Sequence, residues 1–303
     1  MSLIAIFTAP KPFTNLHIAV IQRNAIQSWL HLPDVEIFLI GEESGLARVA
    51  EEFGVRHLPN VARNTNGTPL IRSMFDLVRR NSKSPLLCIV NTDILLMSDL
   101  VTAVRQVAAK RERFVLLGRR WDLEMKEPFD FSSDWESRLQ ARASKHGRLH
   151  KPAGSDYFVF PRFCYSEVPD FAIGRAGWDN WMIYKAHKEK WPLIDTTDSV
   201  MIIHQNHDYS HLPGGQPHYT LPETDENIRL AGGTTVIRYS ILDATAKLVN
   251  GKIRPPSLTW GRLLRIIERW MRAVFGPVLP ENTLEAVVRP RRWYKRAKRF
   301  LRK

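Results

Sequence analysis

The chain has 303 residues, of which 44% are hydrophobic and 10% are aromatic, so it is too apolar for a disordered protein and long enough for one large domain or two modest ones. Its two cysteines, Cys88 and Cys164, exclude a disulfide framework and a clustered-cysteine zinc site. We therefore expect a protein of a reducing compartment.

The hydropathy pattern also bears on location. No apolar run approaches the roughly 18–20 residues that cross a bilayer. Residues 3–7 (LIAIF) follow no basic residue and stop before Pro10, which predicts a strand rather than a signal peptide. We expect a cytoplasmic protein rather than a secreted or membrane-spanning one.

The formal net charge of +13 is concentrated at the end of the chain. Residues 289–303 (RPRRWYKRAKRFLRK) hold nine of the 44 Lys and Arg residues and none of the 31 acidic residues. Residues 1–288 therefore carry 35 basic and 31 acidic residues, a net charge of +4. The basicity is a property of the C-terminal segment rather than of the body.

Strand-like and helix-like segments alternate over the first 120 residues. Asn15 (or Thr14) and Ser98 are the expected N-caps of two helices. In chain order the pattern predicts strand 3–8, helix 17–30, strand 35–40, helix 45–53, strand 55–58, helix 68–80, strand 86–90, helix 99–110 and strand 114–117. The strands are apolar on both faces, which indicates an α/β domain whose mostly parallel sheet is covered by helices on both faces.

The order is looser after residue 120, where helices are predicted over 134–145 and 179–190 and strands over 157–160 and 199–203. We expect one domain over residues 1–225 and a basic helical region over residues 226–303. In the second region Arg254-Pro255-Pro256 predicts a linker. Residues 258–275 then predict an amphipathic helix with an apolar stripe and flanking arginines.

Ligands of open α/β sheets bind beyond the carboxyl ends of the strands. The first strand ends at Thr8-Ala9, where a nucleotide base or ribose would lie, and Glu42 after the second strand could accept ribose or base hydrogen bonds. Strand 86–90 runs into Asn91-Thr92-Asp93, and a carboxylate there either caps the next turn or holds a divalent cation that neutralises a diphosphate. There is no GxGxxG and no GxxxxGK[ST] motif, which disfavours a Rossmann dehydrogenase and a P-loop enzyme.

Two later segments combine glycine with an acid. Asp156 follows Gly154 and precedes a strand, and an Asx-type turn explains it as well as a ligand-binding role does. Residues 174–181 (GRAGWDNW) allow close approach at the glycines and offer tryptophan surfaces to a sugar ring. Asp179 in this segment is either a helix N-cap or a general base, and a helix N-terminus would lower the pKa of such a base.

Histidines gather late in the predicted domain, at positions 204, 207, 211 and 218. A neutral imidazole can ligate a metal, and loop histidines on a polar surface are the structural alternative. We expect at least one of His204 and His207 to touch a metal or a diphosphate.

These segments resemble the GT-A glycosyltransferases over roughly residues 1–210. Asn91-Thr92-Asp93 is similar to the DxD element of that family, with Asn in place of the first acid. The resemblance implies a GT-A-like, Rossmann-type α/β fold and a Mn²⁺ or Mg²⁺ ion on the diphosphate of a nucleotide-sugar donor. The resemblance implies that the metal is held by Asp93, His204 and His207 and that Asp179 is the base. It implies that the acceptor contacts Asp156, Trp178 and Asn180. The residues implied for the donor are Thr8, Ala9, Glu42, Arg72, Asn91, Thr92 and Asp93, with Arg119 and Arg175 as further candidates for binding the diphosphate.

The implied activity is hexosyl or deoxyhexosyl transfer to a hydroxyl of a glycan or lipid-linked acceptor, as in polysaccharide biosynthesis, with inversion if Asp179 is the base. One alternative is a nucleotidyltransferase, although Thr8-Ala9-Pro10-Lys11-Pro12 lacks the glycines that such an enzyme would carry. The other is a non-enzymatic nucleic-acid-binding protein that uses the basic C-terminus, although the body has no matching excess of charge.

The C-terminal region has three interpretations: it lies on an anionic membrane, it binds nucleic acid, or its helix packs on the domain. An apolar stripe beside basic residues favours a membrane surface, since nucleic acid does not need the stripe. We expect peripheral association at the inner face of a membrane and no nucleic-acid partner.

Overall fold

The computed structural model describes residues 1–207 and 221–275. The chain forms two compact units, Met1–Pro256 and Ser257–Lys303. The predicted linker Arg254-Pro255-Pro256 ends where the first unit ends, whereas the predicted domain boundary at residue 225 lies inside helix α7 (Pro222–Ala231). Strands β12 (Ala246–Val249) and β13 (Lys252–Arg254) also belong to the first unit, so the sheet of this unit extends past that boundary.

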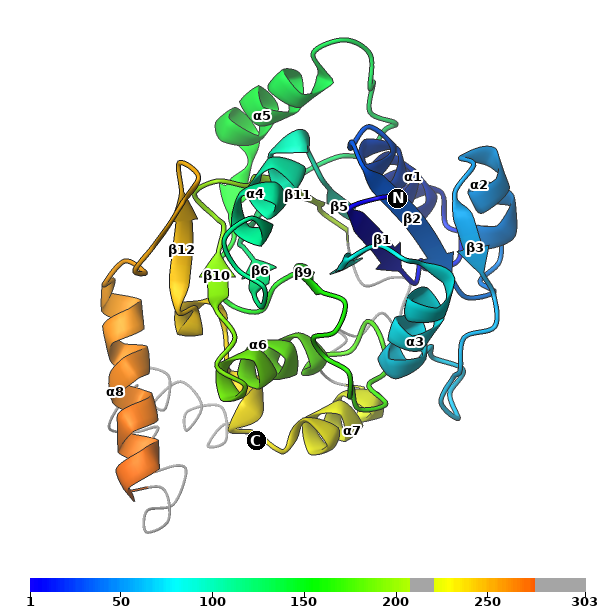
Figure 1. Ribbon diagram of the computed structural model, residues 1–303. Coiled ribbons are helices and arrows are strands. Elements are labelled where there is room, and N and C mark those ends of the chain that lie inside the picture. Colours follow the sequence, from blue (N-terminus) through cyan, green and yellow to red (C-terminus); the bar gives the residue numbers. More distant parts are fainter. Residues whose placement is uncertain (208–220, 276–303) are drawn as a thin grey trace, which may run out of the picture. The chain divides into compact units, whose positions relative to one another are not determined.

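The first unit is built on a nine-stranded sheet in the order β13-β12-β10-β6-β9-β4-β1-β2-β3 (Figure 1). Its strands are β1 (Ile4–Thr8), β2 (Val35–Ile40), β3 (Arg56–Leu58), β4 (Leu86–Val90), β6 (Val115–Leu117), β9 (Tyr157–Pro161), β10 (Leu193–Asp195), β12 (Ala246–Val249) and β13 (Lys252–Arg254). Strand β9 runs antiparallel to both of its neighbours, and β13 runs antiparallel to β12. The other neighbouring strands pair in parallel, which confirms the predicted mostly parallel sheet.

Alternate residues of the central strands enter two separate cores. In β1, Ile4 and Ile6 pack on one face of the sheet, while Ala5 and Phe7 pack on the other. The first face is covered by α1 (Leu16–Leu30), α2 (Leu46–Glu52) and α4 (Ser98–Ala108), and the second by α3 (Ile71–Asn81) and α6 (Trp178–Lys188). Burial of both faces explains the continuous apolar runs of these strands.

A second sheet has the order β5-β11-β7-β8, with β5 (Ile94–Leu95), β7 (Arg120–Leu123), β8 (Arg148–Leu149) and β11 (Ile202–Gln205). Helix α5 (Trp135–His146) packs on it through Trp135, Leu139 and Ala143. Strand β11 lies between β5 and β7, which come from much earlier in the chain. This pairing brings the late histidine segment beside the exit of β4.

The helix caps agree with the sequence at one position and differ at another. The side chain of Asn15 accepts a hydrogen bond from the backbone N–H of Ile18, as predicted for an N-cap. Ser98 is not a cap: the helix starts at Ser98 after Met97, and the Ser98 hydroxyl donates to Glu136 instead. The prediction was wrong because Glu136 of α5 accepts hydrogen bonds from both the backbone N–H and the hydroxyl of Ser98.

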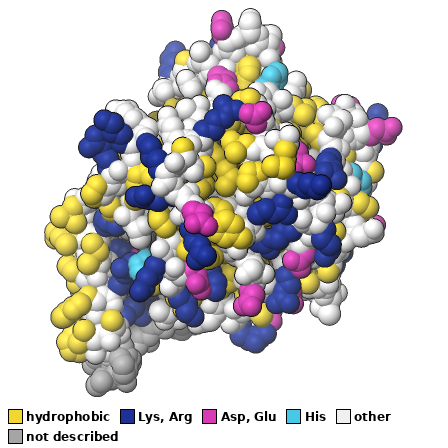
Figure 2. Space-filling model, viewed as in Figure 1, with side chains coloured by type: hydrophobic (Ala, Val, Ile, Leu, Met, Phe, Trp, Pro, Cys, Tyr) yellow, Lys and Arg dark blue, Asp and Glu magenta, His cyan; other side chains and the backbone are white. Residues whose placement is uncertain are grey.

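The second unit contains helix α8 (Trp260–Phe275) within the described residues. Its apolar residues Trp260, Ile267, Trp270 and Val274 are exposed and recur at helical spacing. Figure 2 shows apolar side chains gathered along this helix. No helix in the described part of the chain is long and apolar enough to cross a membrane.

Candidate active site

A cavity of about 800 Å³ opens beyond the carboxyl ends of β1 and β4. The predicted residues that line it are Thr8, Ala9, Asn91, Thr92, Asp93, Asp156, Arg175, Trp178, Asp179, Asn180, His204 and His207. Residues as far apart in the sequence as Thr8 and His207, 199 positions, therefore line one cavity. Its position is the one expected for a ligand of an open α/β sheet.

The segment after β4 is held by hydrogen bonds from three directions. The hydroxyls of Thr8 and Thr92 are 2.7 Å apart across the parallel β1–β4 pair. The backbone N–H of Asn91 donates to the carbonyl of Asp156, and that of Gln205 donates to the carbonyl of Asp93. These contacts fix the backbone of Asp93, so its carboxylate has a defined direction.

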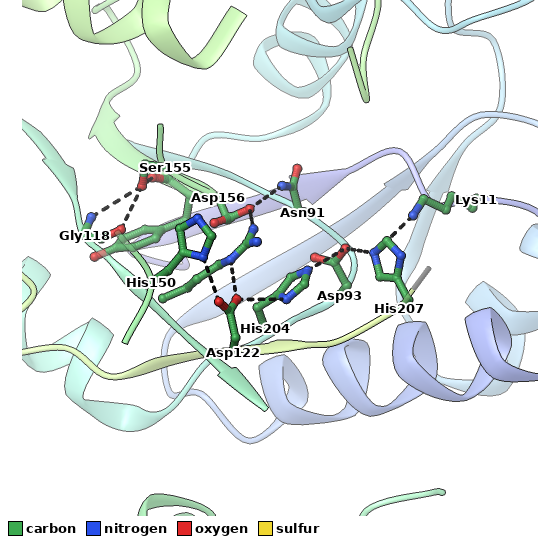
Figure 3. Close-up of polar contacts among 12 residues, drawn as sticks. Lys11, Asn91, Asp93, Gly118, Asp122, His150, Ser155, Asp156, His204 and His207 are labelled. Carbon is green, nitrogen blue, oxygen red and sulfur yellow. Dashed lines mark hydrogen bonds and ion pairs between the residues drawn. The ribbon is translucent and has the colours of Figure 1, made fainter. Parts of the chain in front are cut away.

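The carboxylate of Asp93 faces two imidazole rings (Figure 3). His207 Nε2 lies 3.0 Å and His204 Nε2 lies 3.8 Å from Asp93 Oδ2. One candidate ligand atom from each of the three residues lies within 4.8 Å of the others. The second oxygen, Asp93 Oδ1, is buried without a hydrogen-bond partner. An uncompensated buried carboxylate oxygen beside two imidazoles fits a site for a divalent cation.

Positive groups dominate the electrostatics around Asp93. Burial by itself would raise the pKa of its carboxyl, but His204, the hydrogen bond from His207 and Lys11 hold that pKa well below the ordinary value. Burial lowers the pKa of the Lys11 ammonium, and the charge of Asp93 opposes that shift. Lys11 Nζ lies 3.5 Å from His207 Nε2. The carboxylate is therefore ionised and surrounded by groups suited to an anionic ligand.

Asn91 and Asp156 line the cavity together and are hydrogen-bonded to each other. The amide of Asn91 donates to Asp156 Oδ1 over 3.0 Å, and the guanidinium of Arg120 donates to the same oxygen over 2.7 Å. This explains why asparagine stands where a DxD element has its first acid. A second carboxylate at position 91 would repel Asp156, whereas the amide donates to it.

Asp179 lies near the start of α6, two residues after Gly177. Burial raises the pKa of Asp179 to about 6, and the negative charge of Asp156 raises it further. Hydrogen bonds from the backbone N–H groups of Asn180 and of Asp179 itself lower this pKa but do not cancel the effect of burial. The helix N-terminus was expected to lower this pKa, and that expectation is wrong because desolvation outweighs the backbone donors. A carboxyl with a pKa near 6 is ionised at neutral pH and retains basicity as a proton acceptor.

Gly154 makes room for this carboxyl. A Cβ atom at position 154 would lie 1.6 Å from Asp179 Oδ2, which is far inside contact distance. The missing side chain of Gly154 therefore lets the backbone before β9 approach the carboxyl of Asp179 closely.

Some predicted residues lie elsewhere. Glu42 is exposed, and its neighbour Glu43 lines the cavity and pairs with Arg63 at 2.9 Å. Arg72 pairs with Asp170, and Arg119 donates to the carbonyl of His150; neither arginine is part of the cavity lining.

The aromatic and cationic candidates divide in the same way. Trp178 is buried but lines the cavity, whereas Trp181 packs against Tyr165 and Phe171 and offers no face to a ligand. Arg175 lines the cavity and is paired with Glu223 at 2.7 Å. His211 and His218 lie outside the described residues.

Four further residues near the cluster were not predicted from the sequence: Lys11, Arg120, Asp122 and His150. All of them except Asp122 line the cavity. Lys11 comes three residues after the end of β1, so the position of this strand end could have indicated it. The other three come from β7 and the segment after β8, which no sequence motif marks.

The comparisons with known proteins address the fold. No protein-family model and no curated protein matches the sequence. Among solved structures, TarS of S. aureus in complex with UDP-GlcNAc matches 96% of this chain and 82% of its own, with a TM-score of 0.51 and 12% identity. The chain has a GT-A-like fold.

Two further matches to this GT-A-like fold have lower scores. The mannosyltransferase PcManGT of Pyrobaculum calidifontis, in complex with GDP-Man and Mn²⁺, aligns over 69% of this chain at 12% identity and a TM-score of 0.44, and this chain spans 58% of it. Glucosyl-3-phosphoglycerate synthase of Mycobacterium tuberculosis, in complex with Mg²⁺ and uridine diphosphate, aligns over 67% of this chain and 71% of its own at 11% identity and a TM-score of 0.40.

Proposed function

We propose that the protein is a glycosyltransferase that moves a hexosyl or deoxyhexosyl group from a nucleotide-diphosphate donor to an acceptor hydroxyl. The observation that carries the proposal is the cluster of Asp93, His204 and His207 at the carboxyl edge of a GT-A-like sheet, with Asp179 in the same cavity. A cation site and a separate basic carboxylate in one cavity are what sugar transfer from a diphosphate needs.

The cation would be Mn²⁺ or Mg²⁺, held by Asp93, His204 and His207, and when bound it would neutralise the charge of the diphosphate leaving group. The donor set favours Mn²⁺, because Mg²⁺ prefers ligands that are all oxygen. Lys11 lies beside this cluster and would contact the phosphates directly. Thr8, Ala9 and Glu43 line the part of the cavity that we assign to the nucleoside.

Asp179 would accept the proton of the acceptor hydroxyl as that oxygen attacks the anomeric carbon. The new glycosidic bond would form while the bond from the anomeric carbon to the diphosphate oxygen breaks, and the nucleoside diphosphate would leave with the electron pair. Attack from the side opposite to the leaving group would invert the anomeric centre. Asp156, Trp178 and Asn180 line the cavity near Asp179 and would orient the acceptor.

We propose a lipid-linked or envelope glycan as the acceptor, because the C-terminal region suits an anionic membrane surface. Helix α8 carries exposed Trp260 and Trp270, and the sequence after it ends with nine basic residues between 289 and 303. That basic segment lies outside the described residues. On the face seen in Figure 2, acidic side chains are interspersed among the basic ones, which gives no support to nucleic acid as a partner of the body.

The test is a thermal-shift screen of nucleoside diphosphates with and without Mn²⁺. We expect one nucleotide to raise the melting temperature only when metal is present, because ligand binding stabilises the folded state. Asp93→Ala should abolish this shift. The matched control is Asp170→Asn, an exposed acid paired with Arg72 outside the cavity, which should retain it. A metal-independent shift of equal size in both variants would contradict the proposal.

A further inference from the structure

Asp122 lies directly opposite a proposed metal ligand in the second sheet. Strands β7 and β11 pair in parallel, and the register sets Asp122 against His204. Partners in register point to the same face of a sheet, so the two side chains meet. Asp122 is not part of the cavity lining and carries no role in the function proposed above.

The two nitrogens of the His204 ring face two different carboxylates (Figure 3). Nε2 lies 3.8 Å from Asp93 Oδ2, on the cavity side, and Nδ1 lies 3.3 Å from Asp122 Oδ1. Nδ1 is buried and makes no well-aligned hydrogen bond, so its 3.3 Å approach to Asp122 Oδ1 is a charge contact in the present geometry. Asp122 is therefore the acceptor within reach of this ring nitrogen.

Asp122 is itself fixed by two further groups. Arg120 Nε donates to Asp122 Oδ1 over 2.8 Å, and His150 Nδ1 lies 2.7 Å from Asp122 Oδ2. Arg120 also donates to Asp156, so one guanidinium joins the acid behind His204 to an acid of the cavity lining. The carboxylate has little freedom to turn away from the imidazole ring.

A histidine that binds a metal through Nε2 must carry its proton on Nδ1, and a carboxylate that accepts this proton sets the ring orientation and raises the basicity of Nε2. We propose that Asp122 is the positioning residue of His204, holding the ring so that Nε2 points at the cation shared with Asp93 and His207. This inference rests on the proposed function, since it requires a cation at that cluster.

The test measures Mn²⁺ binding to the full chain by titration calorimetry, together with the ¹⁴N modulation of the Mn²⁺ spin echo that an imidazole ligand produces. Asp122→Asn removes the charge but keeps the shape, and we expect it to weaken Mn²⁺ affinity by roughly ten- to hundred-fold and to reduce the ¹⁴N modulation. Asp130→Asn is the matched control, since it also removes an Asp–Arg pair, with Arg138, and should leave both readouts unchanged.

Asp122→Glu gives a second measurement if Asp122→Asn does not fold. It keeps the negative charge beside Arg120 but displaces the carboxylate from His204 Nδ1, and it should also weaken Mn²⁺ binding. Wild-type affinity and modulation in a folded Asp122 variant, or an equal loss in Asp130→Asn, would overturn the positioning role alone. Absence of Mn²⁺ binding to the wild-type chain would overturn the cation site and this inference together.

Discussion

At the scale of single residues, the surroundings decide which chemistry each acid can perform. Asp93 is held ionised by His204, His207 and Lys11, whereas Asp179 is desolvated and has a pKa of about 6. Two carboxyls in one cavity thus have separated pKa values, which supports the proposed roles of Asp93 in cation binding and of Asp179 in proton transfer. The sequence shows the two acids but not this separation, because it arises from burial and from residues far away in the chain.

The raised pKa of Asp179 predicts the pH dependence of transfer. The base must be ionised to accept a proton, so kcat/KM should be constant above about pH 7 and fall roughly tenfold per pH unit below about pH 6. Asp179→Asn should reduce kcat by about 10²–10⁴-fold and leave the metal-dependent nucleotide shift intact. Steady-state release of nucleoside diphosphate across pH checks both. Full turnover in Asp179→Asn would remove this residue from the mechanism.

At the scale of elements, the sequence predicts much of the first unit and little of the second sheet. The early strands and helices are confirmed because each is buried through its own apolar pattern, as in β1, β4 and α1. The short strand β7 has an intermediate burial pattern and no such signal, and its pairing with β11 joins segments about 80 residues apart. The site residues contributed by β7 depend on that long-range pairing, which no local pattern reveals.

Helix α4 carries a partly buried acid, Asp99, whose pKa affects the stability of the fold. Burial raises the pKa of Asp99 to about 6, the backbone N–H of Met201 opposes this by donating to it, and its Oδ1 has no hydrogen-bond partner. Because the folded-state pKa lies above the unfolded value of about 3.9, the charged form destabilises the fold. Stability attributable to this group should therefore fall as the pH rises from about 4 to about 6.

Asp99→Asn should accordingly stabilise the protein at about pH 8 by on the order of 1–2 kcal/mol. The gain should shrink as the pH falls below about 6 and be lost below about pH 4, as protonation neutralises the acid in both states. Urea unfolding of both proteins across this range measures the difference. The same gain at every pH would show that the charge of Asp99 is not the cause.

At the scale of the whole molecule, the chain combines a GT-A-like unit with a unit whose sequence is strongly basic and amphipathic. We predict that the full chain sediments with phosphatidylcholine vesicles only when they contain phosphatidylserine, and that added salt releases it. Trp270→Ser should weaken binding at all salt concentrations, because it removes an exposed apolar side chain of α8. Equal binding to neutral vesicles, or binding that salt does not change, would contradict an electrostatic membrane partner.

The most direct measurement of the central claim is an anomalous difference map from a crystal grown with Mn²⁺ and a nucleoside diphosphate. The proposed function predicts one manganese peak within about 2.5 Å of Asp93, His204 and His207, bridged to the diphosphate oxygens. A nucleotide bound in the cavity with no manganese at Asp93, or manganese bound elsewhere on the chain, would contradict it.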